Sequence, residues 1–162
     1  MRVAILTISD AGSRGERADL SGDAIAEWAE ARGHAVAERA LVPDDTPAIV
    51  RALAAWADGD RADLVLTTGG TGLTARDVTP EATRAVLEKE APGIAEAIRA
   101  AALPAFPRAA LSRGLAGVRG RTLIVNLPGS PGGVRDGLAV LDGLAAHAVE
   151  LVRGTSTAHA GG

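Results

Sequence analysis

Four short apolar runs, each followed by a polar loop or a turn, most constrain what this 162-residue chain can fold into. They cover residues 2–9, 34–42, 64–68 and 122–126. Short runs rich in apolar residues are typical of strands covered on both faces. Longer alanine-rich segments separate most of them, so strands and helices alternate along the chain. This alternation predicts an α/β fold with three layers, in which a mostly parallel sheet lies between two layers of helices.

Five helices are expected between and after these runs, over about residues 20–32, 46–58, 79–90, 92–103 and 134–153. Pro47 suits the first turn of the second helix, which either Thr46 or Asp45 caps. Thr79 is expected to cap the third helix in the same way. The pair Arg119-Gly120 predicts a hairpin turn before the last apolar run.

The length of the chain suits one domain, which we place at residues 1–153, with residues 154–162 as a flexible tail. The chain contains no cysteine, which excludes disulfides and cysteine-ligated zinc. Its opening apolar run is too short for a signal peptide, and no apolar run is long enough to cross a membrane. These features predict a soluble cytoplasmic protein.

The charge and aromatic content argue against a nucleic-acid partner. The net charge is −3, and no stripe of basic residues interrupts it. Binding of single strands also needs aromatic platforms, yet the chain has two Trp, one Phe and no Tyr. Trp28 and Trp56 lie in predicted helices, where packing in the core is expected. Lys89 is the only lysine in the sequence, which argues against phosphate-loop and Schiff-base chemistry.

Four polar loops follow the predicted strands. They are Ser9-Asp10, Pro43-Asp44-Asp45, Thr68 to Asp77, and Asn126 to Pro131. The carboxyl ends of parallel strands share one edge of a sheet, so these loops are expected to lie together there. They offer glycines, hydroxyls and carboxylates but neither histidine nor thiol, which argues against a Ser-His or Cys-His nucleophile.

The loop Gly69-Gly70-Thr71-Gly72 has two interpretations. Its glycines let the backbone bring several N–H groups close to an anion, which would make it a phosphate cradle. It could equally be a tight turn that needs positive φ. No Gly-Lys-Ser/Thr follows, so it is not a Walker A loop, and its glycine spacing does not fit a dinucleotide fingerprint.

Two carboxylates on the expected edge, Asp44 and Asp77, are candidate ligands of Mg²⁺. Each taken alone is more simply a turn residue or a helix-start residue. Together with a glycine cradle they suit Mg²⁺, which takes one or two carboxylates plus substrate phosphates. Arg113 is either a phosphate donor or a surface charge. Asn126 is either functional or a turn former.

Several of these segments, taken in order, resemble the MogA/MoaB family of molybdenum-cofactor biosynthesis. The segments are Ile8-Ser9-Asp10, Asp19-Leu20-Ser21-Gly22, Leu41-Val42-Pro43-Asp44, Thr67 to Gly72, Arg76 to Thr83, Leu111-Ser112-Arg113 and Asn126 to Pro131. The combination of the glycine loop with Arg-Asp-Val-Thr-Pro-Glu is the most specific of them.

The resemblance implies a homotrimer that adenylylates molybdopterin with ATP and Mg²⁺, and a MoeA-like molybdenum-insertion protein as a further partner. It implies catalytic roles for Asp44 and Asp77, with Asp44 as the metal ligand. The remaining implied residues bind substrate. They are Ser9, Asp10, Gly69, Gly70, Thr71 and Gly72 on the nucleotide side, Ser112, Asn126, Pro128, Gly129, Ser130 and Pro131 on the pterin side, and Arg113 as a further substrate-binding residue.

Two other functions stay open at this stage. A family member could bind the pterin or act as a scaffold without turning it over, although the presence of both Asp44 and Asp77 favours the enzyme. An unrelated anion-binding regulator would explain the glycine loop alone but not the whole set of loops.

Overall fold

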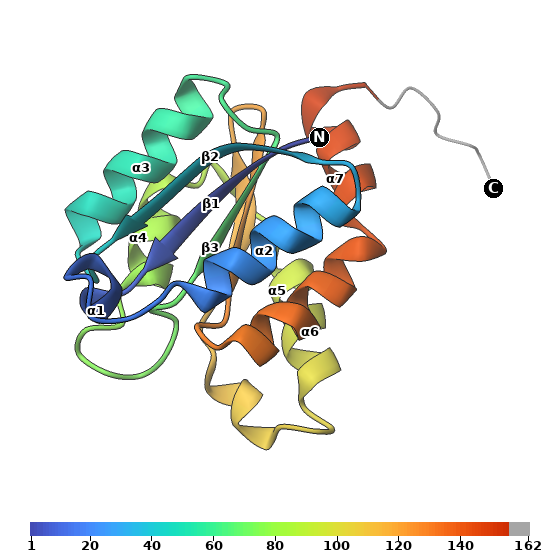
Figure 1. The fold of residues 1–162 in the computed structure, drawn as a ribbon. Coiled ribbons are helices and arrows are strands. Elements are labelled where there is room, and N and C mark those ends of the chain that lie inside the picture. Colours follow the sequence, from blue (N-terminus) through green and yellow to red (C-terminus); the bar gives the residue numbers. More distant parts are fainter. Residues whose placement is uncertain (156–162) are drawn as a thin grey trace.

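The computed structural model describes residues 1–155 as a six-stranded sheet with the strand order β2-β1-β3-β6-β5-β4 (Figure 1). The strands are β1 (Arg2–Ile8), β2 (Ala35–Val42), β3 (Leu64–Thr68), β4 (Lys89–Glu90), β5 (Ala116–Arg119) and β6 (Thr122–Leu127). β1, β2, β3 and β6 run parallel to one another, and at one edge β5 pairs antiparallel with β6 and β4 pairs antiparallel with β5. The predicted mostly parallel sheet is confirmed, and Arg119 and Gly120 lie in the predicted hairpin.

Helices cover both faces of the sheet, which confirms the predicted three layers (Figure 1). They are α1 (Asp10–Ser13), α2 (Leu20–Ala31), α3 (Thr46–Asp58), α4 (Thr79–Val86), α5 (Pro92–Ala102), α6 (Pro131–Asp142) and α7 (Ala145–Arg153), with a 3₁₀ helix at Pro107–Leu111. α3 and α4 pack on one face, and α2, α5, α6 and α7 pack on the other.

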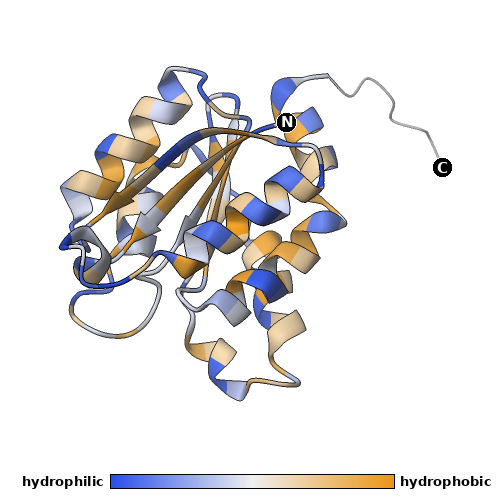
Figure 2. Cartoon of the chain, in the orientation of Figure 1, coloured by the Kyte–Doolittle hydropathy of each residue, from blue (hydrophilic) through white to orange (hydrophobic). Residues whose placement is uncertain are grey.

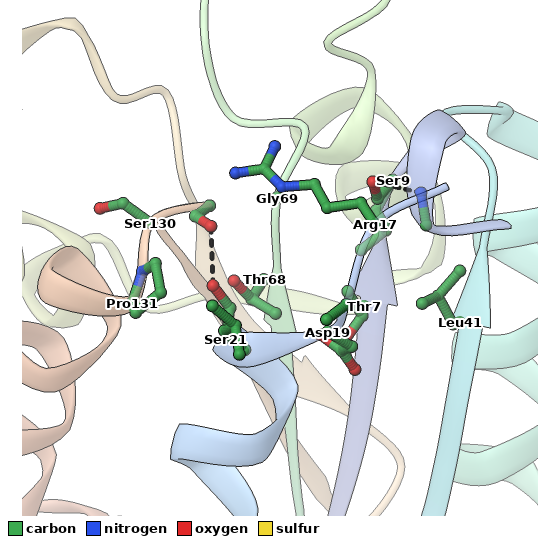
Figure 3. Close-up of a pocket in the computed structure, with 15 residues that line it drawn as sticks. Thr7, Ser9, Arg17, Asp19, Ser21, Leu41, Thr68, Gly69, Ser130 and Pro131 are labelled. Carbon is green, nitrogen blue, oxygen red and sulfur yellow. Dashed lines mark hydrogen bonds between the residues drawn. The ribbon is translucent and has the colours of Figure 1, made fainter. Parts of the chain in front are cut away.

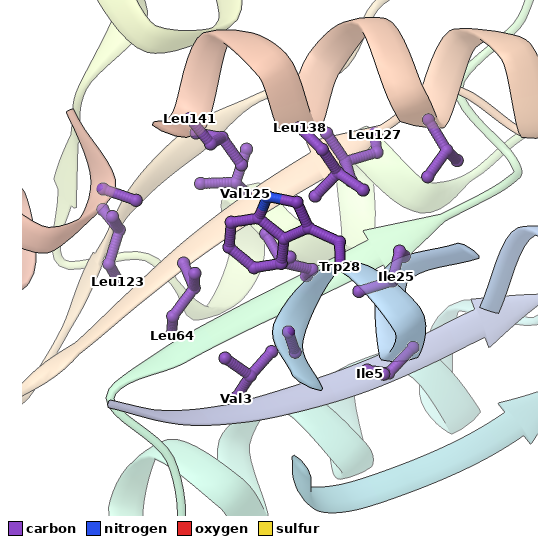
Figure 4. Close-up of a cluster of buried hydrophobic side chains, with 14 of the residues drawn as sticks. Val3, Ile5, Ile25, Trp28, Leu64, Leu123, Val125, Leu127, Leu138 and Leu141 are labelled. Atoms are coloured by element: carbon purple, nitrogen blue, oxygen red, sulfur yellow. The ribbon is translucent and has the colours of Figure 1, made fainter. Parts of the chain in front are cut away.

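Alternate residues of the strands supply two separate apolar cores. On β1, Val3 and Ile5 face the core that contains Trp28 (Figure 4), whereas Leu6 faces the core that contains Trp56. Figure 2 shows the hydrophobic character of the central strands in orange. Both Trp side chains are buried, as the sequence predicts. A strand with apolar residues on both faces can only lie in the middle of such a sandwich, and this fixes β1, β3 and β6 at its centre.

Two predicted helices end earlier than their sequence suggests. The helix expected to reach Glu90 ends at Val86, because Leu87 is extended and Glu88 N donates to Val118 O, which starts β4. The helix expected over 134–153 is two helices, α6 and α7, that meet at Gly143. Glycine is a weak helix former, so a break there costs little.

The caps of two helices also differ from expectation in part. Asp45 rather than Thr46 caps α3, with its side chain accepting from Ala48 N at 3.0 Å. Thr79 does not cap α4; its hydroxyl instead donates to Gly69 O at 2.9 Å. The Thr79 hydroxyl is completely buried, so leaving it without a hydrogen-bond partner would be costly. Its bond to the Gly69 carbonyl ties α4 to the glycine loop.

Within residues 1–155, no helix combines the length and the apolar character that a bilayer crossing requires. Most of the segment expected as a flexible tail, residues 156–162, lies outside the described part of the chain.

Candidate functional site

The four polar loops meet where β1, β2, β3 and β6 end, an edge we call the carboxyl rim. Asp10 N donates to Asp44 Oδ2 at 3.0 Å, which joins the loops after β1 and β2. Thr68 Oγ1 donates to Pro128 O at 2.7 Å, which joins the loops after β3 and β6. The predicted clustering of these loops is therefore confirmed, and it follows from the parallel pairing of the strands.

All four carbonyl groups of the glycine loop, residues 69–72, are bound to the protein behind it. Thr79 donates to the first two from its hydroxyl and its amide, and Arg113 donates to the last two from its amide and Nε, at 2.8 to 3.0 Å. In a trans peptide the N–H points opposite to the C=O, so the loop amides face away from these anchors. Within residues 1–155, the N–H groups of residues 70–72 donate no hydrogen bond. They are free to bind an anion, as a cradle requires.

The glycines at positions 69 and 70 are needed for conformation as well as for space. Their φ angles are +97° and +66°, which side chains disfavour. A Cβ on Gly69 would overlap the Ile8 carbonyl oxygen, and a Cβ on Gly70 would overlap the Thr79 hydroxyl. The tight turn and the cradle are therefore two aspects of one loop.

Three carboxylates border this loop. Asp44 N donates to Asp10 Oδ1 at 3.0 Å, the reciprocal of the bond from Asp10 N, and Arg76 binds both oxygens of Asp10. The bond from Arg76 lowers the pKa of Asp10. Burial raises the pKa of Asp44, and the charges of Asp10 and Asp77 raise it further. A nearby cation would therefore stabilise the charged form of the Asp44 carboxylate.

The donor set fits Mg²⁺ carried on a phosphate rather than a metal enclosed by the protein. A Cβ on Gly70 would lie 3.0 Å from Asp44 Oδ1, and one on Gly72 would lie 2.9 Å from Asp77 Oδ2, so both carboxylates flank the cradle. No group of three or more metal-binding side chains occurs in the described part of the chain. Mg²⁺ with one or two carboxylates and substrate phosphates needs no such group.

Two pockets open on the carboxyl rim. The first, here called the α2 pocket, has a volume of about 360 Å³ and is lined by Ser9, Gly69 and the start of α2 (Figure 3). The second, called the α5 pocket, has a volume of about 320 Å³ and lies between α5 and α6, with Ser112 and Pro128 in its wall. Ser130 lines both. The loop of residues 128–131 therefore lies between the two pockets and forms part of the wall of each.

Residues 4–144 match a protein family described as "Probable molybdopterin binding domain". The chain belongs to this molybdopterin-binding family. The match covers most of the chain, including the glycine loop, both candidate carboxylates and the loop between the pockets.

Individual members of the family align along almost the whole chain. The molybdopterin adenylyltransferase of Helicobacter pylori (strain J99) is 39% identical over 95% of this chain and 89% of its own length. The Drosophila melanogaster molybdenum cofactor synthesis protein cinnamon is 41% identical over 91% of this chain, which spans 25% of that longer protein. The crystal structure of the molybdopterin biosynthesis enzyme MoaB from Thermus thermophilus has a TM-score of 0.89 and 54% identity, covering 94% of this chain and 96% of that one. The predicted family and fold are confirmed.

Two residues that the family resemblance assigns to substrate are engaged within the protein. Asn126 is 3% exposed, accepts from Leu115 N at 3.0 Å, and donates to Thr67 and Thr83 hydroxyls. The Arg113 side chain donates to Gly72 O and Asp77 O and pairs with Glu81. Arg113 is thus neither a free phosphate donor nor a plain surface charge, and both side chains support the loops around the pockets.

Several side chains that line the pockets in this family member were not singled out from the sequence. Arg17 and Asp19 line the α2 pocket, and Phe106 and Asp136 line the α5 pocket. Figure 3 shows the Arg17 side chain extending over the α2 pocket. The sequence feature that could have indicated the α2 pocket is the segment Asp19-Leu20-Ser21-Gly22. In this segment Asp19 caps α2 by accepting from Gly22 N. Nothing in the sequence around Phe106 indicates a pocket.

Proposed function

We propose that this chain is a molybdopterin adenylyltransferase, which converts ATP and molybdopterin to adenylyl-molybdopterin and pyrophosphate. The observation that carries the proposal is the pair of pockets on one rim that share the loop of residues 128–131, with Gly69 of the glycine loop in the wall of the α2 pocket. Asp44 and Asp77 flank the rest of the glycine loop. Such a site suits a reaction between two anions. The name and the near full-length alignment of the Helicobacter pylori relative support the same activity.

In this proposal the α2 pocket takes the nucleotide and the α5 pocket takes the pterin. Ser9 and Gly69 line the α2 pocket, next in the chain to Asp10 and to residues 70–72, and Ser112 and Pro128 line the α5 pocket. An oxygen of the pterin's terminal phosphate attacks the α-phosphorus of ATP. A new P–O bond forms as the bond to pyrophosphate breaks, and the bridging electrons leave with pyrophosphate.

The residues of the site then act by position and charge. The attacking phosphate is ionised near neutral pH, so a strong general base is unnecessary, which suits a rim without histidine. The free N–H groups of residues 70–72 would bind phosphate oxygens in the transition state, and they are held in place before substrate arrives. Asp44 and Asp77 would hold Mg²⁺, which supplies positive charge to the ATP phosphates when bound.

Two further properties are proposed on the family resemblance alone. They are a homotrimeric assembly and a MoeA-like molybdenum-insertion protein as partner. A cytoplasmic location is proposed from the lengths of the apolar runs in the sequence. Sedimentation equilibrium at micromolar concentration tests the first, with a mass three times that of the chain as the expected result. A monomer or dimer would contradict it.

The activity is tested by incubating the purified chain with molybdopterin, ATP and Mg²⁺ while pyrophosphate is measured. We expect pyrophosphate to appear only when all three are present. A chain that binds molybdopterin, by quenching of pterin fluorescence, and still releases no pyrophosphate is a binding protein rather than an adenylyltransferase.

A further inference from the structure

Two buried hydroxyl groups outside the predicted site attach the loop that divides the pockets. Thr68 Oγ1 donates to Pro128 O at 2.7 Å. Ser21 Oγ donates to Gly129 O at 2.8 Å, the bond that is dashed in Figure 3. Thr68 is 1% exposed and Ser21 is 6% exposed, so water competes little for either bond. The two anchors come from the end of β3 and the start of α2, and they hold two consecutive carbonyls of the loop.

The attachment fixes the direction of the next two N–H groups. No peptide bond in residues 1–155 is cis, so each N–H points opposite to the C=O of the same peptide. With both carbonyls held, the N–H groups of Gly129 and Ser130 point away from Thr68 and Ser21. Both residues are exposed and line the α2 pocket, and neither N–H donates a hydrogen bond within residues 1–155.

The loop also lies against the anion cradle. A Cβ added to Gly129 would lie 3.3 Å from Gly69 Cα, so the backbones of the two loops are in close contact. Gly69, Gly129 and Ser130 line the α2 pocket together, so the loop with free N–H groups at residues 129–130 meets the glycine loop at this pocket. A phosphate bound at this edge of the pocket would lie beside both loops.

We propose that Thr68 and Ser21 are positioning residues for phosphate transfer. By holding the carbonyls of Pro128 and Gly129, they direct two N–H groups toward the phosphate at the boundary of the two pockets. The inference rests on the proposed function for the identity of that phosphate, whereas the attachment of the loop does not depend on it.

Thr122 provides a matched control for Thr68. Its hydroxyl donates to Ala62 O at 2.8 Å and the residue is fully buried, on the neighbouring strand β6. It lies at the opposite end of the sheet from the carboxyl rim. Thr68→Val and Thr122→Val thus remove the same kind of bond, from the same kind of environment, near to and far from the pockets.

Hydrogen exchange measured by mass spectrometry tests the attachment without any substrate. The hydrogen-bonded amides of the segment are those of Gly133 and Val134, which donate to Ser130. We expect Thr68→Val and Ser21→Ala to speed the exchange of these two amides by about tenfold, which corresponds to a loss of roughly 1.4 kcal/mol. Thr122→Val should leave their exchange unchanged. Equal exchange of Gly133 and Val134 in Thr68→Val and wild type would overturn the attachment.

Steady-state kinetics per folded molecule test the positioning. Thr68→Val should lower kcat by about tenfold or more, because misplaced N–H donors act mainly on the transition state, while KM for ATP changes by less than about threefold. Thr68→Ser should restore most of kcat, and Thr122→Val should stay within about twofold of wild type. If Thr68→Val and Thr122→Val have the same kcat, the positioning role is wrong. A wild-type chain without activity would instead contradict the proposed function and leave the exchange result to decide the attachment.

Discussion

Asp44 illustrates at the scale of one residue how the proposed metal ligand differs from its neighbour. Asp44 is half-buried beside the glycine loop, and burial raises its pKa. Asp45, the next residue, is exposed and caps α3. From the sequence, Asp45 is a candidate cap of this helix and Asp44 is either a turn residue or a metal ligand, and the fold shows the cap at Asp45. A carboxylate kept where burial opposes its charge is typical of a functional site.

The pair Asp44→Asn and Asp45→Asn tests this difference. We expect Asp44→Asn to fold and to lower adenylyl transfer by about 100-fold or more, because a ligand of the ATP-bound metal is lost. Asp45→Asn should stay within about twofold, since asparagine is as good a cap as aspartate. The measurement is pyrophosphate release at several Mg²⁺ concentrations, where higher Mg²⁺ should recover part of the activity of Asp44→Asn. Equal rates for the two variants would show that Asp44 is a structural residue.

Arg17 is the residue most suited to meet the nucleotide by charge. It is exposed over the α2 pocket and forms no ion pair within residues 1–155, whereas Arg14 on the same loop pairs with Glu16. We expect Arg17→Ala to raise KM for ATP by about tenfold, the loss of one charge-assisted hydrogen bond. Arg14→Ala is the control and should change KM for ATP by less than about twofold. An unchanged KM in Arg17→Ala would remove this arginine from the nucleotide site.

At the scale of elements, the glycine loop depends on contacts from distant parts of the chain. Thr79 and Arg113 hold its carbonyls, and Ile8 crowds Gly69 from β1. A substitution in the loop therefore disturbs packing as well as the space for a phosphate. This differs from a loop that simply leaves room for a ligand.

Gly70→Ala should lose stability and activity together. Its positive φ and the overlap with the Thr79 hydroxyl predict a loss of about 1–3 kcal/mol in the free energy of unfolding. Gly93→Ala, in α5, is the comparison, because a Cβ there meets no atom within 4 Å. Urea unfolding of both variants checks the prediction, and an unchanged midpoint for Gly70→Ala would show that the loop adapts at no cost.

The elements that the sequence predicts well are those fixed by local patterns. The strands that end at Thr68 and Asn126 were placed to within a residue, because apolar runs and glycine loops mark them. The helix ends near Val86 and Gly143 could not be predicted, since pairing of β4 with β5 and packing of α7 decide them. The anchoring role of Arg113 was also hidden, because its partner Gly72 lies 41 residues away.

At the scale of the whole molecule, the two ends of the parallel strands have different tasks. The pockets lie at the carboxyl rim. At the amino ends of the strands, ion pairs connect β1 to α7, the last helix. Arg2 donates to Asp63 and Arg153 pairs with the same carboxylate at 3.1 Å. Figure 1 shows the N-terminus beside α7, where these residues meet. The ion pairs of Asp63 therefore lie at the end of the strands opposite the carboxyl rim.

The contribution of Asp63 should depend on pH. Burial alone would raise the pKa of Asp63, but hydrogen bonds and charge from Arg2, and the charge of Arg153, outweigh it and hold the pKa below its ordinary value of 3.8. A lowered pKa in the folded state stabilises the fold above pH 3.8, and the effect disappears as the pH falls through the folded-state pKa.

Asp63→Asn should therefore be less stable than wild type by roughly 2 kcal/mol at pH 7. The difference should shrink steadily below about pH 3.8. Urea unfolding at pH 7, 4 and 3 measures it. A difference that stays constant across this range would mean that Asp63 acts through packing rather than through its charge.

The measurement that tests the central claim most directly is the fate of labelled ATP phosphates. The purified chain is incubated with molybdopterin, Mg²⁺ and ATP labelled at either the α- or the γ-phosphate, and the pterin product is separated. Adenylyl transfer predicts that the α label appears on the pterin and the γ label appears in pyrophosphate. Label from the γ-phosphate on the pterin, or no labelled pterin from a folded chain that binds both substrates, would contradict the account.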